Sequence, residues 1–187
     1  MRKTLLAVTL VPVLTLGAAG IAQTRAQSTD VNVDAAAEGI VGTATVVNEK
    51  GENVGSASFR MAPSGMMIIT ASITGLTQGW HGFHVHETGK CEPAEGFKTA
   101  GGHLADGKEH GVLAEGGPHP GDLPNQMVQD DGILVTEVFS TALTEALLFD
   151  ADGSAIMVHS GRDDYKSQPA GDAGSRVACG VIEKAGS

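Results

Sequence analysis

Two histidines separated by one residue, His84 and His86, stand in the run Gly82-Phe83-His84-Val85-His86-Glu87. A β-strand sends residues i and i+2 to the same face of a sheet. A strand here aims both imidazoles at one point, which is half of a transition-metal site. Six of the seven histidines lie between His81 and His119, and His159 follows a later apolar run. The chain must therefore fold so that these side chains converge, and a sheet is the simplest way to do it.

The rest of the chain also reads as short strands. The run 54–61 alternates apolar and polar residues, which is typical of a strand with one buried face. Further strands are expected at 42–47, 66–73, 82–87, 133–139, 155–159 and 176–182. No stretch is convincingly helical, and the core must rest on aliphatic side chains because aromatic residues are few. About eight short strands with turn signals between them predict an all-β antiparallel sandwich or barrel.

Two long stretches, 88–121 and 160–174, are rich in glycine, proline or polar residues and show no apolar periodicity. Loops of this length inside a compact domain are unusual and most often functional. We therefore expect two functional loops on a β-scaffold.

The N-terminus has the pattern of a secretory signal peptide. Arg2 and Lys3 precede an apolar stretch of twelve residues, too short for a membrane span of about 20 residues, and small residues follow it. We expect cleavage after residue 22, or as late as 26. Residues 23–38 are then a flexible segment and 39–187 one domain. The mature protein is expected in the periplasm or outside the cell, with no membrane attachment.

The net charge limits the partners that the protein can bind, and the cysteine content indicates a disulfide. The formal net charge of −10 becomes −12 when Arg2 and Lys3 are removed, which argues against nucleic acid as a partner. Cys91 and Cys179 are the only cysteines. An even number of cysteines in an exported chain favours a disulfide. Two thiolate metal ligands are the alternative, although no CxxC spacing is present.

The candidate metal donors exceed one tetrahedral site. They are six imidazoles and one carboxylate: His84, His86, His103, His110, His119, His159 and Asp122. Two ions fit them if one imidazole serves both. Their order predicts a strand-borne group for one ion (His84, His86, His159) and a loop-borne group for the other (His110, His119, Asp122), with His103 between the groups in sequence. Imidazole suits copper and zinc, and carboxylate suits zinc. His81 is expected to be a structural histidine, pointing away from His84.

These residues carry a resemblance to a known family. The segments concerned are Gly82-Phe83-His84-Val85-His86-Glu87, Gly101-Gly102-His103, Pro118-His119-Pro120-Gly121-Asp122-Leu123-Pro124, Val158-His159 and 172–182. Together they are similar to the exported bacterial type of copper–zinc superoxide dismutase, from about residue 40 to 182. The resemblance implies an eight-stranded Greek-key β-barrel and the disproportionation of superoxide to dioxygen and hydrogen peroxide, as antioxidant defence outside the cytoplasm.

The resemblance also implies a role for each matching residue. Copper would be held by His84, His86, His103 and His159, and zinc by His103, His110, His119 and Asp122, so that His103 bridges the two ions. Asp163 would link a copper ligand to a zinc ligand, and Cys91 and Cys179 would form the family disulfide. Arg176 would guide superoxide at the channel mouth, and His103 would also relay a proton. Lys98 and Lys108 are candidates for attracting the anion, with solvated loop charge as the plainer reading.

One departure concerns the zinc loop. Seven positions separate His103 from His110, apparently one fewer than is usual in the family, and the family's His-Phe-Asn-Pro after the bridging histidine is here His103-Leu104-Ala105-Asp106. The alternative to an enzyme is a dismutase-like module that binds copper and zinc without significant turnover. A secreted β-domain with incidental histidines leaves the ligand order unexplained. The sequence is compatible with a monomer or a homodimer.

Overall fold

The expected strands are present in the computed structural model, which describes residues 39–186. The expected signal peptide and flexible segment at 1–38 lie outside the described residues. The strands are β1 (Ile40–Asn48), β2 (Asn53–Met61), β3 (Met67–Ile73), β4 (Gly79–His86), β5 (Asp122–Val128), β6 (Leu134–Ser140), β7 (Ala155–His159), β8 (Arg176–Val181) and β9 (Glu183–Lys184). Short helical turns are η1 (Pro93–Glu95), η2 (Lys98–Ala100) and α2 (Glu145–Leu148).

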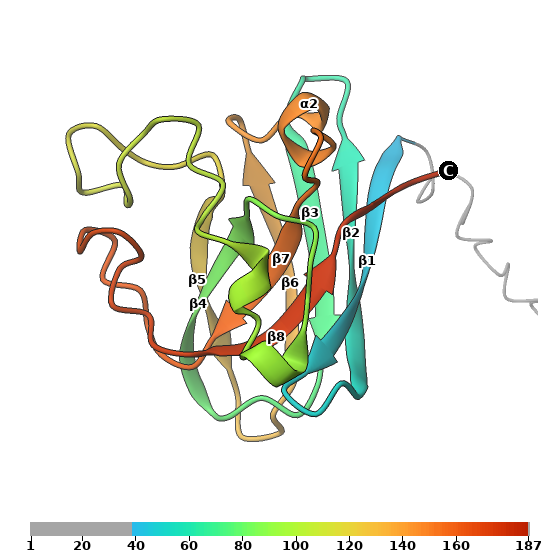
Figure 1. Ribbon diagram of the computed structural model, residues 1–187, viewed down its shortest axis with the longest axis vertical. Helices are drawn as coiled ribbons and strands as arrows, with labels where there is room; N and C mark the ends of the chain where they lie inside the picture. Colours follow the sequence, from blue (N-terminus) through green and yellow to red (C-terminus); the bar gives the residue numbers. More distant parts are fainter. Residues whose placement is uncertain (1–38, 187) are drawn as a thin grey trace, which may run out of the picture. The chain divides into compact units, whose positions relative to one another are not determined.

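The strands form one antiparallel sheet that curls into a nearly closed barrel (Figure 1). Its order is β5-β4-β7-β8-β1-β2-β3-β6, and β9 pairs with β1 at one side. The terminal strands β5 and β6 lie next to each other. Neighbours that are distant in sequence, such as β4 with β7 and β1 with β8, give the Greek-key connectivity. The all-β antiparallel prediction is therefore confirmed.

Alternating residues of the strands fill the barrel. Phe83 and Val85 of β4 point into the core together with Ile156 and Val158 of β7, and all four are buried. Since neighbouring side chains alternate, His84 and His86 must lie on the opposite face of β4. The core is less purely aliphatic than expected, because Phe59, Phe83 and Phe97 are among its largest fully buried side chains.

The two long loops lie on the same side of the barrel (Figure 1). The first runs from β4 to β5 and contains η1 and η2, and the second joins β7 to β8. Cys91 in the first loop forms a disulfide with Cys179 of β8, with an S–S distance of 2.04 Å. This pairing confirms the expected disulfide and excludes the thiolate-ligand alternative. The loops cover the outer face of β4, where the histidines point.

The sequence reading missed two strands, the two-residue β9 and the longer β5. It ended the first long loop at residue 121 and assigned no strand to 122–128, where β5 runs. Pro124 obscures the pattern, since proline cannot donate to a ladder and is confined to edge positions. β5 is indeed at one end of the strand order. None of the helices within residues 39–186 combines the length and apolarity needed to cross a bilayer.

Candidate metal centre

Four histidines from three parts of the chain form the first cluster. His84 and His86 lie on β4, His159 ends the neighbouring strand β7, and His103 forms an isolated antiparallel bridge with His86. All four side chains are buried, and one ring nitrogen from each lies within 4.8 Å of the others. The strand pairing thus brings His159 to the His-x-His pair, and the first loop adds His103.

The hydrogen bonds of the rings indicate which nitrogens face inward. Each strand-borne ring directs its outer nitrogen at an oxygen atom. These contacts are His84 Nε2 to Asp163 Oδ2 at 2.7 Å, His86 Nδ1 to Gly101 O at 3.0 Å, and His159 Nδ1 to Gly174 O at 3.3 Å. On the inner side, His86 Nε2 and His159 Nε2 lie 3.3 Å apart. His84 Nδ1 and His103 Nε2 are buried without a hydrogen-bond partner among the described residues. Such unpartnered nitrogens are costly unless something binds them.

The second cluster is arranged around one carboxylate oxygen. Asp122 Oδ1 lies 2.9 Å from His103 Nδ1, 3.0 Å from His110 Nδ1 and 3.2 Å from His119 Nδ1. The other oxygen, Oδ2, accepts hydrogen bonds from the main-chain N–H groups of Gly111 and His119, at 2.8 and 3.0 Å. The main chain therefore orients the carboxylate so that Oδ1 meets the three imidazoles.

His103 belongs to both clusters. Its Nε2 faces the strand-borne histidines, and its Nδ1 contacts Asp122. The ring is buried and lies with its centroid 3.9 Å from that of His84. An imidazole with each nitrogen in a different donor group has the geometry of a bridging ligand.

Asp163 joins the clusters from the side. Its Oδ2 contacts His84 Nε2 at 2.7 Å and its Oδ1 contacts His110 Nε2 at 3.1 Å. The carboxylate is buried, and Asn125 on β5 holds its main chain through two hydrogen bonds of 2.8 Å. Asp163 thus contacts one imidazole of each cluster.

The shorter interval does not displace His110 from the cluster. The ring is fully buried, and both of its nitrogens contact carboxylates. Gly171 makes room for this arrangement. Its φ is +67°, and a Cβ there would overlap Asp163 Oδ1 and His110 Nε2. A glycine in the left-handed region costs little, whereas a larger residue would be strained and would collide.

Burial and hydrogen bonding favour the neutral form of the four histidines of the first cluster and the ionised form of Asp122. Burial is the main cause that lowers the pKa of His84 and His86 well below the usual value, and neighbouring His103 adds to it. Burial likewise lowers the pKa of His159 to about 4, and lowers that of His103. Burial opposes ionisation of Asp122, but hydrogen bonds from His103 and the Gly111 N–H outweigh it and hold the pKa of Asp122 below its usual range. Neutral imidazoles and an ionised carboxylate are the forms that bind metals.

Arg176 stands next to the first cluster. Its Nη1 donates to Phe97 O at 2.6 Å and its Nη2 donates to Gly101 O at 2.5 Å. Gly101 O also contacts His86 Nδ1, so one carbonyl fixes both the guanidinium and a cluster imidazole. The disulfide attaches this loop to the strand that carries Arg176.

The seventh histidine lies outside both clusters. His81 is buried, with Nδ1 2.6 Å from His159 O and Nε2 2.8 Å from Thr77 O. It is a structural residue, as expected. Lys98 and Lys108 are exposed, and Lys98 directly follows Phe97, whose carbonyl oxygen accepts from Arg176.

Sequence reading missed several residues that position the centre. Asn125, Gln168 and Gly171 hold or accommodate Asp163 and His110. A weak signal existed for Asn125, a polar residue three positions after Asp122 in a segment that could have been read as a strand. Gln168 and Gly171 carry no such signal, because their contacts arise only when the two loops fold together.

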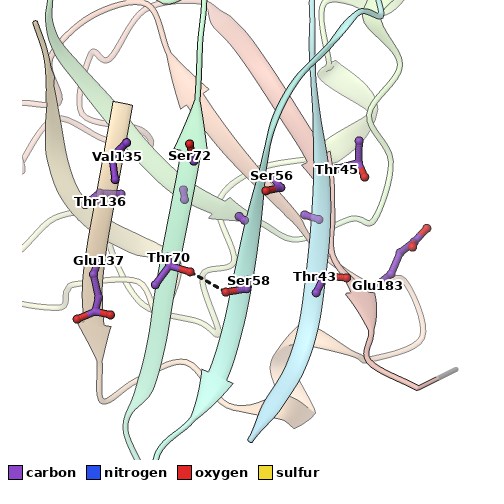
Figure 2. Close-up of a pocket in the computed structure, with 13 residues that line it drawn as sticks. Thr43, Thr45, Ser56, Ser58, Thr70, Ser72, Val135, Thr136, Glu137 and Glu183 are labelled. Atoms are coloured by element: carbon purple, nitrogen blue, oxygen red, sulfur yellow. Dashed lines mark hydrogen bonds between the residues drawn. The ribbon is translucent and has the colours of Figure 1, made fainter. Parts of the chain in front are cut away.

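A separate hollow is lined by residues of β1, β2, β3 and β6 and by Glu183 of β9. It has a volume of about 590 Å³. Figure 2 shows hydroxyl side chains such as Ser58 and Thr70 pointing into it, with their oxygens 2.6 Å apart. None of the clustered histidines lines it. The hollow is therefore distinct from the metal centre.

Comparisons with known proteins give the same family as the site. A family model, copper/zinc superoxide dismutase, matches residues 53–182. A copper–zinc superoxide dismutase of Aquifex aeolicus is 41% identical over 146 residues, which cover 75% of this chain and 86% of the relative. That of Caulobacter vibrioides is 41% identical over 149 residues, covering 75% and 84%.

Solved structures agree with these sequence relatives. A superoxide dismutase-like protein from Bacillus subtilis matches with a TM-score of 0.70 and 34% identity, covering 75% of this chain and 97% of that one. The Cu/Zn superoxide dismutase from Brucella abortus matches with a TM-score of 0.63 and 33% identity, covering 75% and 98%. The chain belongs to the copper/zinc superoxide dismutase family.

Proposed function

We propose that this protein disproportionates superoxide to dioxygen and hydrogen peroxide, with copper in the four-histidine cluster and zinc in the cluster around Asp122. The observation that carries the proposal is the pair of buried, unpartnered nitrogens, His84 Nδ1 and His103 Nε2. They face the same space as His86 Nε2 and His159 Nε2, while the opposite nitrogens of the strand-borne rings are already bound.

The donor sets fit the two metals. Four imidazoles suit copper, and three imidazoles with one carboxylate form the kind of closed tetrahedral site that holds structural zinc. His103 supplies Nε2 to the first set and Nδ1 to the second. Copper contributes the one-electron exchange in both directions that zinc, with its filled d shell, cannot provide.

The chain's own residues bind the anion and deliver a proton. Arg176 carries a permanent charge beside the first cluster, and its guanidinium is fixed by two carbonyl oxygens, so it can hold superoxide there. When no metal is bound to His103 Nε2, this nitrogen can take up a proton and donate it to the reduced oxygen species. Two superoxide anions and two protons yield one dioxygen and one hydrogen peroxide, so proton delivery is half of the task.

We propose that Asp163 fixes the orientation of the two imidazole rings that it contacts. Its two oxygens contact a nitrogen of His84 and one of His110, which fixes the tautomer and direction of both imidazoles. The side chain therefore connects the geometry of the proposed copper site to that of the zinc site.

Local positive charge must offset the acidity of the whole protein. The net charge of −10 repels superoxide. Focusing by local charge raises association rates by roughly 10–10³, a range established partly on this enzyme family. Arg176 is one source, and we propose exposed Lys98 and Lys108 as others.

We also propose that the protein is exported. The basic residues Arg2 and Lys3, the short apolar stretch behind them and the Cys91–Cys179 disulfide support a location in the periplasm or outside the cell.

The test is superoxide consumption by the purified protein loaded with copper and zinc, beside protein loaded with zinc alone. Rapid consumption that depends on copper is the expected result. Binding of one equivalent of copper without consumption would refute the enzyme and favour a metal-binding module.

A further inference from the structure

The side-chain amide of Gln168 pairs with the main chain of His110. The His110 N–H donates to Gln168 Oε1 at 2.9 Å, and Gln168 Nε2 donates to His110 O at 2.9 Å. Nε2 also donates to Lys166 O at 3.1 Å, within its own loop. One side chain thus satisfies both polar main-chain groups of a single residue, as a neighbouring strand would.

Unlike Asp122 and His103, His110 neither lies on a strand nor forms a bridge to one among the described residues. His103 bridges to His86 on β4, and Asp122 begins β5. His119 is tied to Asp122 by two hydrogen bonds, from Asp122 N to His119 O and from His119 N to Asp122 Oδ2. His110 lies in the stretch 104–118, which contains no strand or helix. The flanking N–H groups of Glu109 and Gly111 donate to Gly116 O and Asp122 Oδ2, while the N–H and C=O of His110 itself are paired with Gln168.

We propose that Gln168 is a positioning residue for His110, and that it sets the affinity of the second cluster for zinc while leaving copper affinity unchanged. This inference rests on the proposed assignment of zinc to the cluster around Asp122. The second long loop supplies, through Gln168, the hydrogen-bond partners of the His110 main chain in the first loop.

The chemistry of the contact suits glutamine. A primary amide presents a donor and an acceptor in one plane, whereas an ionised carboxylate can only accept. Asparagine offers the same groups on a side chain shorter by one methylene. Gln168 is exposed, so each hydrogen bond contributes modestly. Losing both should weaken zinc binding by about tenfold, at the lower end of the 10–100-fold cost of disturbing groups that orient metal ligands.

The test compares Gln168→Met with Gln129→Met. Methionine preserves length and removes both hydrogen bonds. Gln129 is an exposed glutamine that directly follows β5, at the opposite end of that strand from Asp122. Zinc and copper affinities are measured separately by competition with chelators, on the whole protein. The melting temperature of each metal-free variant checks that the fold is intact.

We expect Gln168→Met to bind zinc about tenfold more weakly than the unmodified protein and copper within about twofold of it. Gln129→Met should change neither. Equal zinc affinity in both variants overturns the proposal. A parallel loss of zinc and copper overturns it too, because that result means Gln168 supports the whole second loop. These affinity measurements do not depend on superoxide consumption. If the separate activity test showed that the unmodified protein binds both metals without turnover, the proposed enzyme would be refuted and this inference would still stand.

Discussion

The two clusters of the metal centre are positioned by different means. His84, His86 and His159 are placed by paired strands, whose ladders fix the direction of every second side chain. His110 and His119 sit on loop segments, and a single carboxylate, Asp122, gathers them. The proposed redox site is therefore built on rigid backbone, and the proposed structural site depends on side-chain contacts between loops.

Two residues join these regions. His103 contributes one nitrogen to each cluster, and Asp163 contacts one imidazole of each. The difference between the regions teaches where each should be vulnerable. Changes in strand-borne ligands should remain local, whereas changes in the joining residues should reach both sites.

The sharpest test of this separation removes one ligand from each side. In His86→Ala, copper-dependent superoxide consumption should fall by more than about 100-fold, since disturbing groups behind a ligand already costs 10–100-fold. Zinc affinity should stay within about twofold, because His86 is not in the Asp122 cluster. Metal affinities and superoxide consumption are measured together.

The matched variant is His119→Ala, on the loop-borne side. It should lose zinc and retain copper. If either variant lost both metals to the same degree, the two regions would not be positioned independently.

The same contrast explains what could be predicted from the sequence. The His84–His86 spacing indicates a strand and a shared face by period alone, so the first cluster needed only the fold class to assemble. The position of His110 depends on Asp163, Gln168 and Gly171, which lie more than 50 residues further along the chain. Periodicity carries no information about how two irregular loops meet, so Gln168 and Gly171 could not be inferred, and Asp163 was predicted only through the resemblance.

Lowering the pH should reduce the free energy of unfolding of the metal-free protein through the buried strand-borne histidines before it affects Asp122. The folded metal-free protein holds His159 at a pKa of about 4, against about 6.5 when unfolded, because burial disfavours the charged ring. The unfolded chain then binds more protons between these values, so the free energy of unfolding falls as pH drops from about 6.5 to about 4. The loss from this one histidine is about 3 kcal/mol. Buried His84 and His86, whose pKa values are also lowered, act in the same direction.

Urea unfolding of the metal-free protein between pH 7 and pH 4 measures this loss. The pKa of Asp122 is also lowered, so its contribution is present above about pH 4 and is lost only below that value. Bound copper and zinc should move the whole decline to lower pH, since ligands must release metal before they protonate. Constant stability of the metal-free protein from pH 7 to pH 4 would contradict the role of burial.

Asp163→Asn tests the connection between the regions. His84 and His110 contact different oxygens of Asp163, and asparagine replaces one of these acceptors with an NH2 donor, so one of the two contacts is lost. We expect the affinities for copper and zinc to fall by about tenfold each. Competition with chelators measures both, and Asp164→Asn, on an exposed neighbour, is the control. A change confined to one metal would show that Asp163 serves a single site.

β5 shows a second limit of the sequence reading. Its strand was hidden by Pro124, although it carries both Asp122 and Asn125. Asp122 was found through its spacing from His119 and the resemblance, which do not depend on the strand. Asn125 was not found, because it contacts no clustered histidine and instead hydrogen-bonds the main chain of Asp163 in the second loop. Residues that contact a ligand through another residue thus lack the composition signal that ligands have.

The last expected effect is on the rate alone and concerns Arg176, which pairs with His159 in the β7–β8 ladder and shares Gly101 O with His86. Arg176→Met should lower kcat/KM for superoxide by about tenfold and flatten its dependence on ionic strength, because one local charge that focuses the anion is removed. Arg176→Lys retains the charge without the planar fork and should recover most of the rate. Copper affinity should be unchanged in both variants. If copper affinity fell together with the rate, Arg176 would act by holding the loop behind His86 rather than by attracting superoxide. The loop at Gly101 would then be part of what positions the strand-borne site.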